Sequence, residues 1–219
     1  MKFTLKYMKV EAPFFIPFFT EKCPFFDEIK DDLISIIYDI HMKAPYEIQG
    51  TSPSGKHIKD KLTSSDHNFF KIEKEPILRL RQWILEQLVG AYKHLKIRSD
   101  RIVITESWFH YTKKGGYHNY HTHPDCPLGG IFYIEDGGSD LGNSWINPIH
   151  GYAHRISALW CRTVYESKFE PGQLILFPGF ILHSAKPHEG EGKRILCAFN
   201  STPVLHDEQV IRLSSLDGS

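Results

Sequence analysis

The sequence predicts an α+β protein that is mainly β in its second half, with helices supporting a β-sandwich or barrel. Apolar residues recur at helical spacing in two segments before residue 100, which is typical of amphipathic helices. After residue 100 the chain consists of short β-rich runs separated by Gly, Pro and Asn clusters, a pattern typical of strands joined by turns. Helices first and many short strands later indicate this fold class.

Each of the two expected helices begins beside a proline. Residues 25–43 place isoleucine and leucine on one face and acidic residues on the other, and Pro24 precedes them. Residues 75–95, "EPILRLRQWILEQLVGAYKHL", repeat the apolar spacing with Pro76 at the start, a position where proline is favoured. Residues 50–68 are small, polar and charged, so we expect a long loop between the helices.

The expected strands, in chain order, are "RIVITESWFHYT", "GGIFYIE", "QLILF", "ILHSA" and "RILCAFN". A chain of 219 residues with 41% hydrophobic content is long enough for one sizeable core. We therefore expect a single domain over residues 1–219. Within it, residues 1–100 would form a supporting region, residues 101–203 the β core and residues 204–219 a C-terminal tail.

The composition argues against several classes of partner. Twenty-six Lys and Arg balance twenty-six Asp and Glu, so no overall field attracts nucleic acid or an anionic membrane. No apolar run approaches the ~20 residues of a spanning helix, and the start of the chain lacks a signal peptide; we expect a cytoplasmic protein. The four cysteines are scattered without CxxC pairing, which argues against a zinc ribbon and against a disulfide framework.

The stretch "YHNYHTHPD", residues 117–125, holds three histidines and an aspartate. Residues i and i+2 of a strand face the same way. His121 and His123 could therefore share one metal ion, and so could His123 and Asp125. His118 has the wrong parity for either pair. A metal site is predicted here, with two choices for its ligand pair.

A second group of candidates lies about sixty residues downstream. In "PGQLILFPGFILHSAKPHEGEGKRILCAFN" an apolar strand ends at the corner Phe177-Pro178-Gly179, His183 follows, and Arg194 opens the next apolar strand. Such a corner can deliver His183 to the ion from the opposite side of a barrel. The planar fork of an arginine suits a carboxylate, so Arg194 predicts an anionic neighbour of the metal.

These residues resemble a known family. "FHYTKKGGYHNYHTH", "GIFYIE" and the later histidine and arginine are similar to the site motifs of iron(II)- and 2-oxoglutarate-dependent oxygenases, in particular the prolyl-4-hydroxylase-like branch with its uncharacterised bacterial and phage members. The resemblance covers roughly residues 102–201. It implies a double-stranded β-helix, also called a jelly roll, with a cupin-like core flanked by the N-terminal helices.

The resemblance also implies iron(II), 2-oxoglutarate as cosubstrate, and dioxygen. Counting from Tyr111 and the glycine turn, His121 falls where the first ligand is expected, which gives a face of His121, His123 and His183. The alternative register supplies a His-x-Asp pair, so that His123, Asp125 and His183 bind the ion. Spacing favours the first register and ligand chemistry favours the second. No catalytic side chain is expected beyond the metal centre.

Further roles follow from the same resemblance. The residues expected to bind the cosubstrate are Arg194, Tyr111 and Tyr133. Independently of the resemblance, Asn119, Trp145 and Asn147 are candidates for lining the substrate cleft, and nothing in the sequence decides between them. The implied reaction hydroxylates a C–H bond of a peptidyl residue, such as proline, or of a small molecule, with release of succinate and carbon dioxide.

Two other classes remain open. The first is another cupin-type metalloenzyme, one that does not use 2-oxoglutarate. Its motif G-x5-H-x-H is matched by Gly115, His121 and His123, and its motif G-x5-P is matched by Gly172 and Pro178. A non-catalytic jelly-roll binding protein is the other, with the aromatic-rich start "APFFIPFFTEKCPFF" as a partner surface. The expected partner is a peptide or small-molecule substrate, and the sequence does not give the oligomeric state.

Overall fold

The computed structural model describes residues 16–43, 62–64, 68–149 and 162–205. Its elements in chain order are β1 (Phe19–Lys22), α1 (Phe26–Lys43), β2 (Leu62–Ser64), the 3-10 helix η1 (Phe69–Lys71), α2 (Glu75–His94), β3 (Ser99–Thr112), β4 (His118–His121), β5 (Leu128–Glu135), β6 (Leu141–Ile146), β7 (Val164–Lys168), β8 (Gln173–Pro178), β9 (His183–Ala185) and β10 (Arg194–Leu205).

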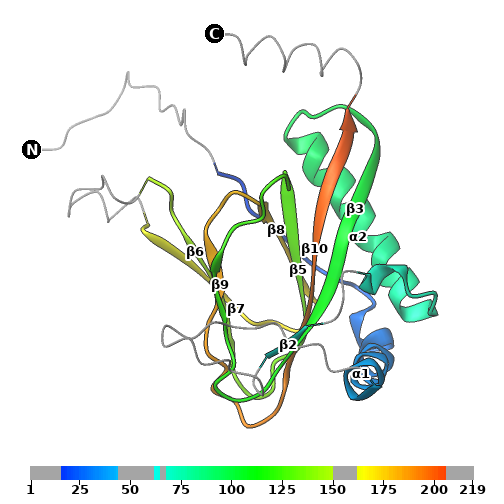
Figure 1. Ribbon diagram of the computed structural model, residues 1–219. Coiled ribbons are helices and arrows are strands. Elements are labelled where there is room, and N and C mark those ends of the chain that lie inside the picture. The colour runs from blue at the N-terminus through cyan, green and yellow to red at the C-terminus, as the bar shows by residue number, and fades with distance from the viewer. Residues whose placement is uncertain (1–15, 44–61, 65–67, 150–161, 206–219) are drawn as a thin grey trace, which may run out of the picture.

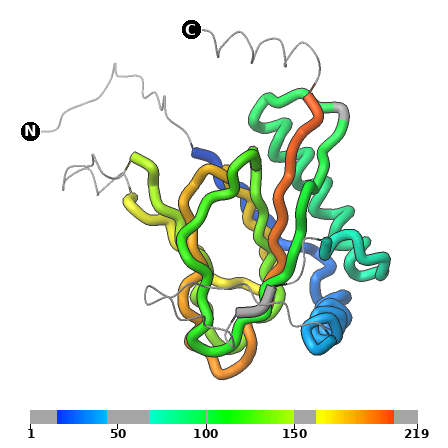
Figure 2. Tube along the Cα trace, viewed as in Figure 1, coloured from blue at the N-terminus to red at the C-terminus, as the bar shows by residue number. Residues whose placement is uncertain are grey.

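The strands form two antiparallel sheets that face each other (Figure 1). The larger sheet has the order β1-β8-β5-β10-β3-β2 and the smaller sheet the order β4-β9-β6-β7. Figure 2 shows β3 and β10, far apart in the sequence, running side by side, with Arg194 opposite Thr112 and Leu196 opposite His110. The predicted fold class, an α+β and mainly β jelly roll flanked by helices, is confirmed.

Both helices lie on the outer face of the larger sheet (Figure 1). The helix expected over 25–43 spans Phe26–Lys43, and the one expected over 75–95 spans Glu75–His94. Their buried leucine and isoleucine side chains pack against one face of the sheet in a single core. Neither described helix combines the length and apolar character that crossing a bilayer requires.

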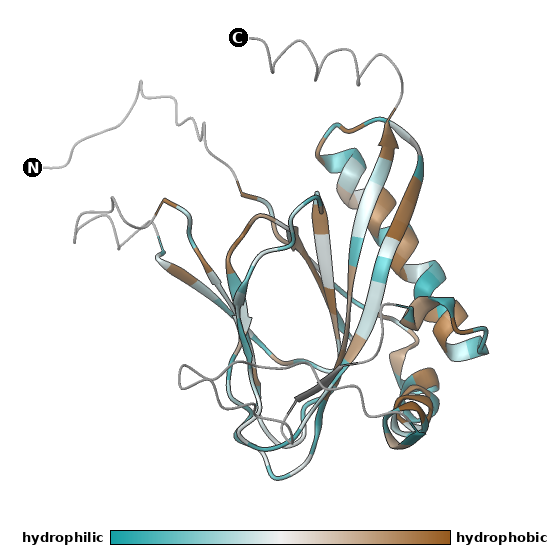
Figure 3. Cartoon of the chain, in the orientation of Figure 1, coloured by the Kyte–Doolittle hydropathy of each residue, from teal (hydrophilic) through white to brown (hydrophobic). Residues whose placement is uncertain are grey.

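Strand alternation separates two cores. Along β10, Ile195 and Cys197 belong to the core under the helices, whereas Leu196 belongs to a second core between the sheets. Along β3, Phe109 faces the helices and Trp108 faces the space between the sheets. Successive side chains of a strand point to opposite faces, so the larger sheet is covered on both sides. Figure 3 accordingly shows β5 and β8 largely in the colour of hydrophobic residues.

Three sequence expectations need correction or lie outside the described residues. Most of the loop expected over 50–68 is not described, but Leu62–Ser64 within it forms β2, which pairs with the end of β3. The β core does not end at residue 203, because β10 continues to Leu205. Residues 206–219 of the expected tail are not described.

Candidate metal centre

Three histidines from neighbouring segments of the smaller sheet meet at one point. His121 ends β4, His183 begins β9, and the two residues are paired across these strands. His123 lies two residues beyond β4. Ligand atoms of the three side chains all lie within 4.8 Å of one another, and Nε2 of His121 is 3.2 Å from Nε2 of His123. Nitrogens bound at ~2.0–2.1 Å to one ion are spaced in this way.

The other ring nitrogen of each histidine is held by an oxygen. Nδ1 of His121 lies 2.8 Å from the Asn119 carbonyl oxygen, and Nδ1 of His183 lies 2.9 Å from the Ile181 carbonyl oxygen. Carbonyl oxygens only accept hydrogen bonds, so both Nδ1 atoms carry the proton. Their Nε2 lone pairs are then free for a metal, and such outer partners are typical of ligating histidines.

His123 is oriented by a side chain from the larger sheet. Its Nδ1 donates to Oδ1 of Asn200 on β10. Nδ2 of Asn200 donates to Oε2 of Glu106 on β3 over 2.8 Å, which fixes the amide with its oxygen toward the histidine. All three imidazoles therefore share one tautomer, with Nε2 toward the common point.

Burial keeps these imidazoles neutral. Desolvation lowers the pKa of His183 to about 3, and neighbouring His121 lowers it further in the same direction. Burial also lowers the pKa values of His121 and His123, against the opposing effect of their hydrogen-bond acceptors. Neutral imidazole is the form that binds metal ions.

The Phe177-Pro178-Gly179 corner shapes the loop that carries His123. The backbone N–H of His123 donates to the carbonyl oxygen of Gly179 over 2.8 Å. A Cβ atom at Gly179 would lie 2.2 Å from the carbonyl oxygen of Cys126 and 2.8 Å from that of His123. Only glycine allows the two loops to approach this closely.

The structure does not bring Asp125 into the histidine group. Its side chain is exposed, and its backbone has a φ of 61° in the turn after β4. The described part of the chain holds one group of three potential ligands within reach of a common ion, and that group is His121, His123 and His183. The geometry therefore supports the three-histidine register.

Arg194 lies in the protein interior at the start of β10. Its side chain is 2% exposed, Nη1 donates to the Leu141 carbonyl oxygen over 3.3 Å, and Nε has no hydrogen-bond partner. Burial lowers its pKa to about 10, so the guanidinium stays charged at neutral pH. No carboxylate of the described residues pairs with it, an unusual state for a buried charge.

Comparison with known proteins bears on this arrangement. The family model described as "Putative 2OG-Fe(II) oxygenase" matches residues 106–200, the segment that contains all three histidines and the arginine. Residues 106–200 thus match the family of Fe(II)- and 2-oxoglutarate-dependent oxygenases. The resemblance seen in the sequence is thereby confirmed. No curated protein sequence matches the chain.

Solved oxygenase structures share the fold at low sequence identity. HygX from Streptomyces hygroscopicus, solved with nickel, 2-oxoglutarate and hygromycin B, superposes with a TM-score of 0.57 at 13% identity, covering 86% of this chain and 83% of HygX. A Pseudomonas putida prolyl-4-hydroxylase superposes with a TM-score of 0.57 at 12% identity, covering 84% of this chain and 92% of the hydroxylase. A Trichoplax adhaerens prolyl hydroxylase, bound to a hypoxia inducible factor peptide fragment, superposes with a TM-score of 0.55 at 10% identity, covering 90% of this chain and 86% of that hydroxylase.

The two tyrosines expected near the cosubstrate lie on opposite faces of the larger sheet. Tyr133 is buried between the sheets, where its hydroxyl lies 2.8 Å from Asn143 Oδ1 and 2.7 Å from Ser167 Oγ. Tyr111 belongs to the helix-side core, and its ring stacks on His41 of α1 at 4.0 Å. The expectation for Tyr111 is corrected, because its strand parity directs the side chain away from the histidines.

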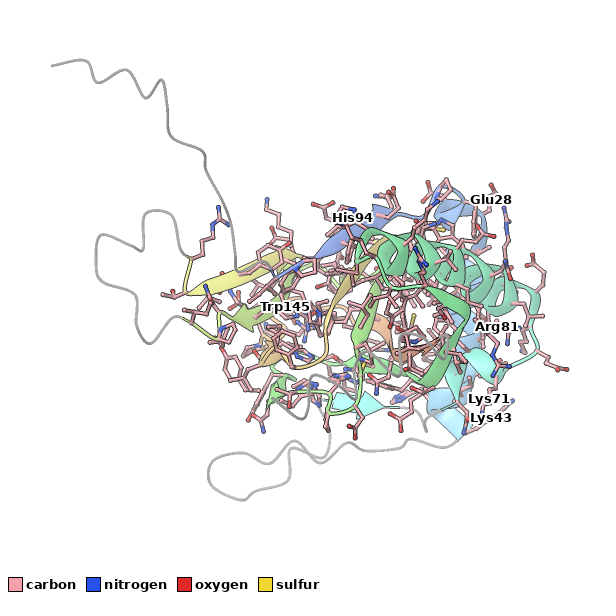
Figure 4. All side chains as sticks on the ribbon, turned by 90° about the horizontal axis from the view of Figure 1, so that it is seen from above. Glu28, Lys43, Lys71, Arg81, His94 and Trp145 are labelled. Atoms are coloured by element: carbon pink, nitrogen blue, oxygen red, sulfur yellow. The ribbon has the colours of Figure 1, made fainter. Side chains whose placement is uncertain are left out.

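The residues expected to line the substrate cleft are partly brought together. Trp145 and Asn147 line one cavity of about 270 Å³ with Phe18, Arg162 and Tyr165. Trp145 also stacks against His183 at a centroid distance of 6.5 Å; Figure 4 shows it over the smaller sheet, away from the helices. Asn119 is not among the residues of this cavity. Its backbone carbonyl instead holds His121.

Several site residues were not assigned a role from the sequence. Asn200 and Glu106 orient His123. His110 and His118 line, together with the three clustered histidines, a small cavity of about 20 Å³. The alternation of "RIVITESWFHYT" could have indicated His110, which shares its face with Trp108, but nothing local to Asn200 indicates a partner 77 residues away.

Proposed function

We propose that the protein is a non-haem iron(II)- and 2-oxoglutarate-dependent dioxygenase that hydroxylates a C–H bond of a small molecule or of a peptidyl residue such as proline. One observation carries the proposal. Three imidazoles with the same tautomer direct Nε2 to one point, and the same interior contains a buried arginine with no carboxylate partner among the described residues.

The donor set fits iron(II). Imidazole nitrogen suits iron as well as zinc, copper and nickel, and His121, His123 and His183 would occupy one face of the ion. When bound, the iron and 2-oxoglutarate supply the oxidising chemistry, in which dioxygen, 2-oxoglutarate and R–H give R–OH, succinate and carbon dioxide. The protein's part is to bind, orient and exclude water.

Arg194 would bind the carboxylate of 2-oxoglutarate that is remote from the metal. An unpaired buried guanidinium requires an anion, and its fork makes two parallel hydrogen bonds to a carboxylate. Tyr133 would support this end of the site. Burial raises the pKa of its hydroxyl, so it remains a neutral phenol, and it already bonds Asn143 and Ser167.

The substrate would enter through the cavity lined by Trp145, Phe18 and Tyr165. These rings contact one another at centroid distances of 5.0 to 5.4 Å, and Trp145 also contacts His183. An apolar group bound there would lie one ring away from the metal. The similar proteins solved with hygromycin B and with a peptide support both substrate classes.

Succinate formation tests this function. Protein prepared without oxygen and supplied with iron(II), 2-oxoglutarate and dioxygen should release succinate, even without substrate. Arg194→Ala should raise the apparent KM for 2-oxoglutarate about thirty-fold to several thousand-fold, because truncating one partner of a buried pair costs ~2–5 kcal/mol. Arg194→Lys should recover part of the loss through charge alone, and iron content should not change in either variant.

The alternatives give different results. Iron binding without succinate formation would favour another cupin-type metalloenzyme, and a protein that binds no metal would favour a jelly-roll binding module. An unchanged KM in Arg194→Ala would show that the remote carboxylate is held elsewhere, with Lys193 and His188 the nearest candidates.

A further inference from the structure

His110 is a buried histidine between the sheets whose Nε2 atom has no hydrogen-bond partner. Its side chain is 6% exposed, and Nε2 is inaccessible to solvent. Native proteins pair nearly all buried polar atoms with a protein group or a bound molecule. Since His110 lines the cavity of the metal centre, the missing partner is expected to be a molecule that binds there.

The strand register places His110 between the three histidines and Arg194. On β3, His110 and Thr112 face the same side, and they pair with Leu196 and Arg194 of β10. His110 is therefore one inward position, about 7 Å along the strand, from the pair that contains the arginine. In the other direction its ring lies 5.1 Å from that of His118, which lies 4.1 Å from that of His121.

Three buried side-chain nitrogens between the sheets have no hydrogen-bond partner among the described residues: Arg194 Nε, His110 Nε2 and Trp145 Nε1. Nη1 of Arg194 is held by the Leu141 carbonyl oxygen, so the guanidinium is anchored with Nε left over. A carboxylate offers two oxygens that both accept hydrogen bonds. Burial lowers the pKa of His110 well below its usual value, so its ring is neutral and has a single N–H to donate.

We propose that His110 donates its Nε2–H to the carboxylate that Arg194 binds, and that the two residues together select a 2-oxo dicarboxylic acid over a 2-oxo monocarboxylic acid. This inference rests on the proposed function. It gives to His110 the contact that the sequence had suggested for its neighbour Tyr111, whose ring lies on the helix side of the sheet.

Equilibrium binding to the nickel(II)-loaded protein tests the proposal without turnover. Calorimetric titrations would use 2-oxoglutarate and 2-oxobutyrate, which lacks the second carboxylate. His110→Leu should weaken 2-oxoglutarate binding roughly 10- to 100-fold, as expected for a lost hydrogen bond to a charged group, and leave 2-oxobutyrate binding unchanged. His110→Gln, whose amide N–H can reach the position of Nε2, should bind 2-oxoglutarate within about five-fold of wild type.

Ile195→Val is the matched control, because it alters a buried residue of β10 on the helix side of the larger sheet, outside the cavity that His110 lines. It should bind both acids as wild type does. If His110→Leu does not fold, His110→Asn replaces it, since its amide is one methylene too short to reach the same place. Nickel content and thermal unfolding are measured on every sample.

Wild-type affinity of the leucine variant for 2-oxoglutarate would overturn the role of His110. An equal loss for both acids would overturn its assignment to the carboxylate at Arg194. Failure of the proposed function gives a different result: the wild-type protein would take up nickel but bind neither acid.

Discussion

Replacing Asn200 by leucine should weaken metal binding without altering any of the three clustered histidines. The amide oxygen of Asn200 accepts the Nδ1–H of His123, and its nitrogen donates to Glu106 over 2.8 Å. Leucine has a similar volume and neither group. The ring of His123 would then lose the bond that sets its tautomer and direction, while the other two imidazoles keep their carbonyl acceptors.

The expected loss is roughly 10- to 100-fold in metal affinity, the usual cost of removing an outer partner of a ligating histidine. That range corresponds to about 1.4–2.7 kcal/mol. The free energy of unfolding of the metal-free protein should fall less, by about 1 kcal/mol, since a net hydrogen bond contributes ~0.5–1.5 kcal/mol.

Competition with a chelator for nickel(II) measures the affinity directly. Glu106→Gln is the matched control. It keeps an oxygen acceptor for the Asn200 amide, and the exposed position of Glu106 leaves its charge screened by solvent, so affinity should stay within about three-fold of wild type. Wild-type affinity in Asn200→Leu would refute the reasoning, because His123 could then not depend on Asn200 for its orientation.

Other variants test the loop and the buried imidazoles. Gly179→Ala should lower both the free energy of unfolding and the metal affinity, since its Cβ would meet the Cys126 carbonyl oxygen at 2.2 Å. Gly90→Ala in α2, where no atom lies within 4 Å of the added Cβ, should instead stabilise the protein by up to about 1 kcal/mol. A melting temperature equal to that of wild type in both variants would contradict both expectations. Burial lowers the pKa values of His118 and His183 to about 3, against ~6.5 unfolded. The unfolded chain therefore binds more protons than the folded chain between these values. Urea unfolding of the metal-free protein should show the free energy of unfolding falling by up to about 1.4 kcal/mol per pH unit for each histidine as the pH is lowered from ~6.5 toward 3. His118→Asn should flatten this loss, and an unchanged slope would contradict the burial of His118.

The sequence predicted the helices and the apolar strands because their patterns are local. Period-3.6 spacing defined α1 and α2 to within a residue or so at each end. Strands β1, β2, β6 and β7 were missed, β2 within the expected loop. β1 and β7 are short and only partly buried, and all four strands are held by pairing with β3, β8, β9 or each other rather than by a pattern of their own.

The site was predictable only in part, for reasons of geometry. His121 and His123 were expected to share a strand, but β4 ends at His121, and the close approach at Gly179 turns His123 toward the same point. Tyr111 shows how a shift of one residue reverses the face of a strand. Asn200 acts through a contact between distant segments, which no local pattern encodes.

Iron content tests the three-histidine centre most directly. Wild type, His121→Ala, Asp125→Ala and His183→Ala would be reconstituted with iron(II) without oxygen, freed of loosely bound metal and measured for iron per chain. Asp125→Ala should retain one equivalent, because its side chain is exposed and apart from the histidines, whereas both histidine variants should lose it. Loss of iron in Asp125→Ala with retention in His121→Ala would contradict the three-histidine centre and favour a ligand set of two histidines and Asp125.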